Sequence, residues 1–239
     1  MLGSAAAEEV PMIQKMLVEK CNLAGKPVIV ATQMLESMID APRPTRAEIN
    51  DIANSVLDGA DAVMLSAETA SGKYPIEAVT SMAQTIRQVE VSEATKGAKQ
   101  TKLYFKYHAA VNDNPGPNVI NDNVVMSACR LARDTQAKAI IGVTRSGYTA
   151  FRISHHRPEA DLYVFTPNRQ LMCTLSLYWG VKTVYYDRED LSTDDLIEDI
   201  KRVLVEQEAL HTGDIFVNTL SMPVSNHRKT NAVKLSVVD

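Results

Sequence analysis

Two hydroxyl side chains stand directly after short apolar runs of the chain. Thr32 follows residues 28–31, and Ser66 follows residues 62–65. Apolar runs without polar alternation are typical of strands buried on both faces of a parallel sheet. In barrels of alternating strands and helices, ligand chemistry gathers at the carboxyl ends of the strands. The two positions therefore predict ligand contact, or else the helix caps and loop hydrogen bonds that hydroxyls also make.

A second group of hydroxyls lies in residues 144–149, between an expected strand and an expected helix. Hydroxyl and backbone N–H groups at a helix N-terminus can bind an anion, and the arginine in this segment adds positive charge. The alternative interpretation is an ordinary capped turn. The basic loop 225–230 suits the same anion, although a solvated hairpin loop has a similar composition. The candidate anion-binding residues are Thr144, Arg145, Ser146, Gly147 and Thr149.

The remaining polar residues give weaker signals. Arg46 lies inside the capping box of Thr45 and Glu48, where surface charge is an ordinary finding. Glu68 is a further carboxylate close to Ser66. The histidines have no partner at catalytic or metal-ligand spacing, so we interpret them as surface or packing residues and assign no metal ligand.

The elements that position Thr32 and Ser66 follow from periodicity. A helix carrying Val10, Ile13, Met16 and Leu17 on one face is expected to stop at Gly25. A second helix begins at Thr45 and closes at Gly59, and a third begins at Pro75. The order helix, strand, helix, strand, helix indicates consecutive βα units. The expected inner faces are Ile49, Ile52, Ala53, Val56 and Leu57 in the second helix, and Ile76, Val79, Met82, Ala83, Ile86 and Val89 in the third.

Residues 92–123 have the composition of a connection, and alternation resumes beyond them. We expect an α/β fold with domains at 1–91 and 92–239. The second domain is predicted to hold a mostly parallel five-stranded sheet, with an antiparallel last strand because its loop is too short for a crossover helix. Its expected helices are 124–133, 150–155, 171–179 and 193–210, and its expected strands are 139–143, 162–165, 183–186, 214–220 and 232–237.

Composition excludes several classes of protein. The net charge is −4 and the pI is about 5.8, so nothing favours nucleic-acid binding. No apolar run approaches a membrane span, and no secretory signal is evident. The three cysteines follow no metal-ligand spacing and suit a reducing compartment. We therefore expect a cytoplasmic protein without a membrane partner.

Three motifs resemble the pyruvate kinase family. They are Ala31-Thr32-Gln33-Met34, Pro44-Thr45-Arg46-Ala47-Glu48 and Met64-Leu65-Ser66-Ala67-Glu68-Thr69. The resemblance implies the last units of a (β/α)8 barrel followed by a regulatory α/β domain. The implied reaction transfers the phosphoryl group of phosphoenolpyruvate to ADP, giving pyruvate and ATP in glycolysis.

The resemblance also implies roles for single residues. Thr32 takes the place of a threonine beside the phosphoenolpyruvate carboxylate that takes part in protonating the enolate, and Ser66 matches a serine on the same proton path. Ala67 stands where the family usually has glycine. Arg46 matches an arginine that bridges subunits near the active site, so a homo-oligomer, in the family a homotetramer, is expected.

The family uses Mg²⁺ or Mn²⁺ together with K⁺. By resemblance, the ligands of these ions and the catalytic lysine belong before position 1, with Met1 in the place of a metal-binding aspartate. We therefore expect this chain alone to be inactive. The rival hypothesis is a non-catalytic effector-binding or interaction module derived from this half of the enzyme.

The family resemblance also bears on residues 144–149. Thr144, Ser146, Gly147 and Thr149 match a loop that binds the phosphate of an effector in allosterically regulated members, and the loop 225–230 lies over that pocket. Tyr148 replaces an arginine or lysine that is common there. The implied ligand is a phosphorylated sugar.

Overall fold

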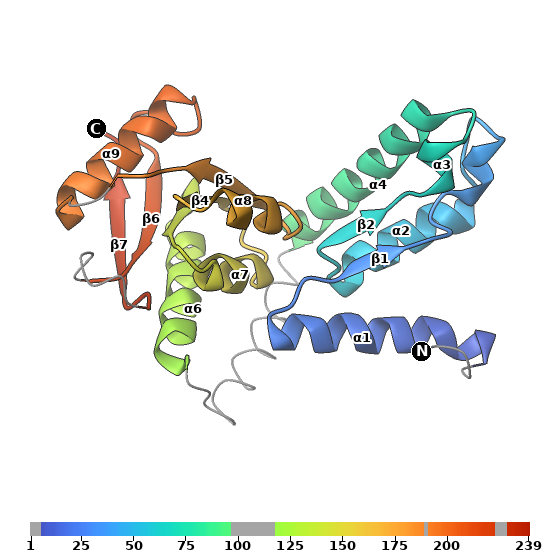
Figure 1. The fold of residues 1–239 in the computed structure, drawn as a ribbon, viewed down its shortest axis with the longest axis horizontal. Coiled ribbons are helices and arrows are strands. Elements are labelled where there is room, and N and C mark those ends of the chain that lie inside the picture. The colour runs from blue at the N-terminus through green and yellow to red at the C-terminus, as the bar shows by residue number, and fades with distance from the viewer. Residues whose placement is uncertain (1–5, 97–117, 189–190, 223–228) are drawn as a thin grey trace. The chain divides into compact units, whose positions relative to one another are not determined.

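The computed structural model describes residues 6–96, 118–188, 191–222 and 229–239. The chain divides into two compact units, Met1–Lys99 and Gln100–Asp239 (Figure 1). The expectations for Met1 and for most of the loop 225–230 lie outside the described residues.

The first unit consists of consecutive βα elements, as the sequence predicts. Its two strands, β1 and β2, pair in parallel, with Ile29 opposite Ala62 and Ala31 opposite Met64. The parallel register brings the carboxyl ends of both strands to one edge. The elements in order are a 3-10 helix at Ala7–Glu9, α1 (Val10–Ala24), β1 (Ile29–Ala31), a 3-10 helix at Glu36–Ile39, α2 (Arg46–Asp58), β2 (Ala62–Met64), α3 (Ala67–Ala70) and α4 (Pro75–Lys96).

The predicted helix boundaries of this unit are confirmed where local chemistry sets them. Gly25 and Gly59 follow α1 and α2 in the left-handed conformation, which glycine adopts without a steric penalty. Thr45 and Glu48 form the complete capping box at the start of α2. Pro75 is the first residue of α4.

The expectation that both strands are buried on both faces is wrong. Ile29 is 43% exposed and Met64 is 42% exposed. Among the described residues, β1 and β2 pair only with each other. The apolar core of the unit covers Val30 and, in part, Val63, and the alternate side chains face away from it.

Two predicted helix faces are also wrong in part. In α1, Val10, Met16 and Leu17 are exposed, and Val18 is the buried apolar residue. In α4 the buried stripe runs through Ala78, Met82 and Ile86, whereas Ile76, Val79 and Ala83 are exposed. Both helices carry apolar residues on more than one face, so periodicity alone could not choose the face that packs.

The second unit is an α/β domain with a five-stranded sheet in the order β5-β4-β3-β6-β7. The first four strands in this order pair in parallel, and β7 pairs antiparallel with β6, as predicted. The elements are α6 (Val119–Asp134), β3 (Ala139–Val143), α7 (Tyr148–His155), β4 (Asp161–Thr166), α8 (Arg169–Leu175), β5 (Val181–Tyr185), α9 (Thr193–Glu206), β6 (Ile215–Leu220) and β7 (Ala232–Val237).

Several predicted boundaries in this part of the chain need correction. Helix α4 extends to Lys96 and α6 starts at Val119, so the helices enter the expected connection from both sides. Helix α8 ends at Leu175 rather than at Trp179, and α9 ends at Glu206. Apolar residues continue past both ends, because Tyr178 and Leu210 still pack into the core after the helix has stopped.

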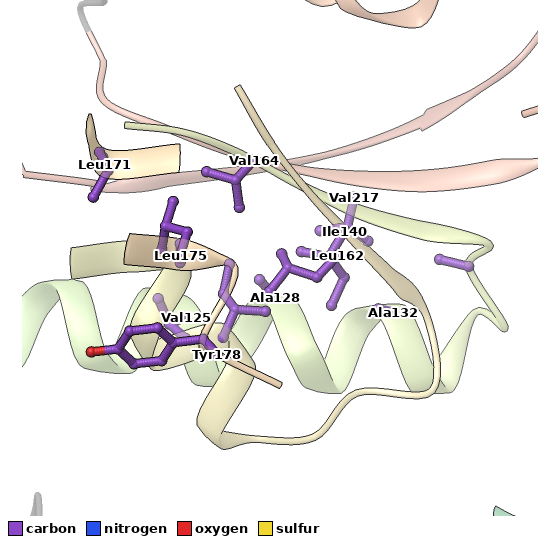
Figure 2. Close-up of a cluster of buried hydrophobic side chains, with 13 residues drawn as sticks. Val125, Ala128, Ala132, Ile140, Leu162, Val164, Leu171, Leu175, Tyr178 and Val217 are labelled. Carbon is purple, nitrogen blue, oxygen red and sulfur yellow. The ribbon is translucent and has the colours of Figure 1, made fainter. Parts of the chain in front are cut away.

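The sheet of the second unit is covered on both faces. On one face, Val125, Ala128 and Ala132 of α6 pack with Ile140, Leu162 and Val217 of the strands (Figure 2). On the other face, α9 packs with the alternate strand residues Ile141, Phe165 and Phe216. Figure 1 shows α9 and α6 on opposite sides of the sheet. Covering both faces buries a complete core within this unit.

In the part of the chain that the structure describes, none of the helices combines the length and the apolar character that crossing a membrane requires.

Candidate functional site

Thr32 lies at the carboxyl end of β1 in an unusual backbone conformation. Its φ is 72°, and Gln33 follows with φ 56°. A β-branched residue rarely adopts positive φ, because its side chain crowds the backbone, and such strain is concentrated at functional sites. The Thr32 side chain is exposed. The hydroxyl is thus presented at the edge of the sheet by a strained turn.

Ser66 lies at the carboxyl end of β2, at the same edge. It is exposed and precedes α3, but its side chain makes no capping hydrogen bond. The alternative prediction, that this hydroxyl serves as a helix cap, is therefore wrong. The hydroxyl remains available to a ligand.

Glu68 connects the loops that carry Thr32 and Ser66. Its side chain is buried, and its carboxylate accepts the backbone N–H of Ser66 at 2.7 Å and that of Leu35 at 3.3 Å. Burial alone would raise the pKa of Glu68, but the backbone N–H donors outweigh burial and lower it. A charged Glu68 therefore fixes the two loops relative to each other. Sequence reasoning identified Glu68 only as an available carboxylate, because nothing local signals a contact with Leu35.

Arg46 is the first residue of α2 and is exposed. The adjacent Glu48 carboxylate accepts hydrogen bonds from the Thr45 backbone at 2.7 Å and from the Ser37 hydroxyl at 2.6 Å. The capping box thereby ties the start of α2 to the segment after β1. The interface role of Arg46 stays a prediction.

The second unit contains a cavity of about 590 Å³ beside the carboxyl ends of β3 and β4. This volume is typical of small-molecule sites. Of the predicted anion-binding residues, Thr144, Arg145, Ser146 and Thr149 line it. Lys229 and Thr230, from the predicted covering loop, also line it, as does Arg188, which carried no sequence signal.

Gly147 lies between Ser146 and Tyr148, which both line the cavity. Its φ is 82°, and a Cβ there would lie 2.7 Å from Leu171 Cδ1. The Gly147 N–H donates to the Thr144 hydroxyl at 3.0 Å, and the Tyr148 N–H donates to Ser146 Oγ at 3.5 Å. These two N–H groups are therefore engaged within the loop. The anion-binding role of residues 144–149 stays a prediction.

Three buried polar side chains form part of the cavity wall. Asn121 of α6 donates to the Thr149 hydroxyl at 3.3 Å, and the Thr149 and Thr230 hydroxyl oxygens lie 2.7 Å apart. All three residues line the cavity. No motif of the sequence indicates Asn121, which is distant in the chain from both threonines.

Tyr148 is held by charged neighbours. Its hydroxyl donates to Asp122 at 2.8 Å and accepts from Arg152 Nε at 3.0 Å, while Arg152 also pairs with Asp122 at 3.2 Å. Burial of the hydroxyl is the main reason that the pKa of Tyr148 is raised. Tyr148 therefore contributes a neutral wall to the cavity rather than a cation.

Among residues 6–96, 118–188, 191–222 and 229–239, no group of three or more His, Cys, Asp or Glu side chains gathers to hold a metal ion. The edge with Thr32 and Ser66 offers Glu68, whose carboxylate is occupied by backbone donors. The described residues therefore do not fit a divalent metal site.

Family models match both units. The model described as pyruvate kinase, barrel domain, matches residues 3–79, and the model described as pyruvate kinase, alpha/beta domain, matches residues 122–236. The chain belongs to the pyruvate kinase family. The first unit is thus a segment of the pyruvate kinase barrel, and the second is the pyruvate kinase C-terminal α/β domain.

Individual pyruvate kinases are similar in sequence to nearly the whole of this chain. A pyruvate kinase of Clostridium acetobutylicum is 41% identical over 232 residues, covering 97% of this chain and 47% of that protein. One of Geobacillus stearothermophilus is 38% identical over 240 residues, covering 97% of this chain and 38% of that protein. A solved pyruvate kinase of Cryptosporidium parvum superposes with a TM-score of 0.86 at 34% identity, covering 100% of this chain and 46% of that one. The chain spans less than half the length of these pyruvate kinases.

Proposed function

We propose that this chain supplies the proton-transfer edge of a pyruvate kinase active site. In the whole reaction, the phosphoryl group leaves phosphoenolpyruvate for ADP, and the remaining enolate takes up one proton at its methylene carbon to become pyruvate. The observation that carries the proposal is the left-handed backbone of Thr32 at the end of β1. Strain of this kind at a β-branched residue supports a functional role.

In this proposal Thr32 and Ser66 relay the proton. An alcohol is too weak an acid to be the final source, so each hydroxyl passes a proton between water and the enolate carbon. Glu68 holds the two hydroxyls in place through the backbones of Leu35 and Ser66. Charged Glu68 accepts hydrogen bonds from backbone N–H groups and is a positioning residue.

Phosphoryl transfer also requires cations that neutralise the developing charge. The family uses Mg²⁺ or Mn²⁺ and K⁺, for which the described residues provide no cluster of carboxylates. No step of the proposal therefore runs through these ions on this chain. We expect the 239-residue chain alone to show no turnover with phosphoenolpyruvate, ADP, Mg²⁺ and K⁺.

A chimera tests the catalytic proposal. The part of the Clostridium acetobutylicum enzyme that precedes its aligned region would be joined to this chain. We expect coupled-assay turnover from the chimera, a loss of about a hundredfold or more with Thr32→Val, and little change with the exposed control Thr80→Val. An active Thr32→Val chimera, or turnover by the chain alone, would contradict the proposal.

We also propose that the second unit binds a phosphorylated sugar as an effector. The cavity brings the hydroxyls of Thr144 and Ser146 together with Arg145 and Lys229. Hydrogen bonds to a charged phosphate contribute about 1.5–3 kcal/mol each. Two or three of them give about micromolar binding after the cost of association.

Calorimetric titration of the chain with sugar phosphates tests this second proposal. Ser146→Ala removes an exposed cavity hydroxyl, whereas Ser127→Ala on the outside of α6 is the matched control. Binding lost in the first variant and kept in the second supports the site. Equal binding by both variants would show that residues 144–149 are an ordinary capped turn and not a phosphate site.

The two experiments together distinguish a pyruvate kinase from a non-catalytic effector-binding module. An inactive chimera that still binds the sugar phosphate would favour a non-catalytic effector-binding module. Turnover that responds to the sugar phosphate would favour a regulated pyruvate kinase. We also propose that the protein is a homo-oligomer with Arg46 at an interface.

A further inference from the structure

The wall of the cavity in the second unit contains an incomplete hydrogen-bond network. Asn121, Thr149 and Thr230 are 2%, 4% and 5% exposed, and all three line the cavity. They come from α6, from α7 and from the segment before β7. Buried polar groups are normally satisfied, so an unmatched donor or acceptor in such a place calls for a partner.

The two threonines leave one hydroxyl hydrogen uncommitted. Their oxygens are 2.7 Å apart, so one hydroxyl donates to the other. Each hydroxyl has a single hydrogen, and the accepting hydroxyl keeps its own. Asn121 Nδ2 already donates to Thr149 and cannot take that hydrogen. Among the described residues, the pair therefore has one donor to spare, whichever way the bond runs.

Asn121 leaves one acceptor without a donor. Its Oδ1 is buried, and no donor of the described residues lies within hydrogen-bonding distance of it. An unpaired buried carbonyl destabilises the folded chain. If the carboxamide were turned over, its oxygen could accept a hydrogen bond from the Thr149 hydroxyl, and the amide nitrogen would become the group without a partner.

One ligand hydroxyl can pair with both the spare threonine hydrogen and the Asn121 oxygen. It accepts the spare threonine hydrogen and donates its own hydrogen to Asn121 Oδ1. With Asn121 Nδ2 toward Thr149, as in the structure, a phosphate dianion, which only accepts, or an ammonium group, which only donates, leaves one of the two groups unpaired. The chemistry of the wall therefore matches an alcohol.

We propose that Asn121, together with Thr149 and Thr230, reads a hydroxyl group of the phosphate ester whose phosphate lies at Thr144–Ser146. This inference rests on the proposed effector site and names a specificity-determining residue for it. Because Oδ1 is covered in the structure, the inference requires the carboxamide to turn toward the cavity when the ligand enters. A cavity of about 590 Å³ has room for a phosphorylated polyol in addition to its phosphate.

Titration calorimetry on the full chain tests the inference. The probes are D-glucose 6-phosphate with its 2-deoxy and 3-deoxy forms, D-ribose 5-phosphate with its 2-deoxy form, and inorganic phosphate. We expect one deoxy form to bind about tenfold more weakly than its parent, the effect of one hydrogen bond to buried partners. In Asn121→Leu that difference disappears, because the parent sugar phosphate loses the same tenfold.

The control variant is Asn123→Leu, on the same helix but outside this cavity, which keeps the difference between parent and deoxy sugar. Asn121→Leu removes both a buried oxygen that has no donor and the hydrogen bond to Thr149, so its thermal midpoint should change little. Thr230→Val gives an independent second variant with the same expected loss of discrimination.

Discrimination that persists in both Asn121→Leu and Thr230→Val would overturn the inference. Equal binding of every parent and deoxy pair by the unmodified chain would also overturn it. In both cases the effector site itself still stands if Ser146→Ala weakens binding of all the phosphate esters. If no phosphate ester binds the unmodified chain, the effector site and the inference fail together.

Discussion

The Glu68 carboxylate accepts the backbone N–H of Leu35 at 3.3 Å, joining the segment after β1 to the segment after β2. The second oxygen of the same carboxylate accepts the N–H of Ser66 at 2.7 Å. Because these bonds favour the charged form and outweigh the opposing effect of burial, the pKa of Glu68 lies below its ordinary 4.5. One buried anion therefore holds the two candidate catalytic loops together.

Glu68→Gln is expected to destabilise the first unit by about 1–3 kcal/mol at pH 7. A lowered folded-state pKa contributes stability that is present above the unfolded value and lost as pH falls through the folded value. The difference between the two proteins should therefore shrink below about pH 4.5. Hydrogen exchange of the amides of residues 29–31 and 62–64 measures this difference in stability between Glu68→Gln and the unmodified chain.

The exposed Glu77→Gln serves as the control for Glu68→Gln and should change exchange little at any pH. The negative charge of Glu48 raises the pKa of Glu68. Glu48→Gln should therefore move the protonation of Glu68 to lower pH. Exchange in Glu68→Gln that matches the unmodified chain at pH 7 would show that Glu68 does not tie the loops together.

Local chemistry made much of the fold predictable. The positions of Gly25 and Gly59 and the capping box of Thr45 and Glu48 depend on residues only a few places apart. The antiparallel β7 followed from loop length alone. The packed face of α4 could not be read in the same way, because Ile76 and Val79 form one apolar stripe and Ala78 and Met82 another.

The candidate sites were predictable only in part for a related reason. Motifs located Thr32, Ser66 and residues 144–149, since each occupies a strand end. Asn121 and Arg188 reach the same cavity from distant positions of the chain, and no spacing signals this. The positive φ of Thr32 contradicts the preference of a β-branched residue, so sequence reasoning could not foresee the strain.

Gly147→Ala is expected to destabilise the second unit and to weaken sugar phosphate binding. The new Cβ would lie 2.7 Å from Leu171 Cδ1 and 2.8 Å from Phe151 Cζ, in a residue with φ 82°. Gly180→Ala is a matched control, because Gly180 has φ 69° and no atom within 4 Å of an added Cβ. We expect about 1 kcal/mol of strain in the control and about 1–3 kcal/mol more in Gly147→Ala. Thermal unfolding followed by circular dichroism compares them, and equal losses would mean that the crowding is absorbed.

His156 should make the second unit sensitive to mild acid. Burial, together with His155 and Arg152, lowers the pKa of His156 from 6.5 to about 4. The unfolded chain binds this proton below about pH 6.5 while the folded chain does not, so stability falls as pH drops from 6.5 toward 4. The loss should reach about 3 kcal/mol at the lower end.

Urea unfolding monitored by Trp179, the single tryptophan of the chain, measures the acid sensitivity. His156→Gln should remove most of the slope between pH 6.5 and 5, above the range where carboxylates titrate. The exposed His211→Gln should retain it. A slope that survives in His156→Gln would assign the acid sensitivity to another group.

Thr32→Asn is expected to stabilise the first unit while impairing the proposed reaction. At φ 72° a threonine is strained, whereas asparagine adopts the left-handed region more readily. Relief of this strain should add about 1 kcal/mol to the stability of the unit, detected as slower hydrogen exchange in β1 and β2. Thr80→Asn, on the exposed face of α4, has similar helix propensity and should change stability by less than about 0.5 kcal/mol. In the chimera, Thr32→Asn should lower turnover because the hydroxyl is gone. A Thr32→Asn chain that is less stable would show that the turn is held by the threonine itself, and the strain at β1 would then carry no argument for function.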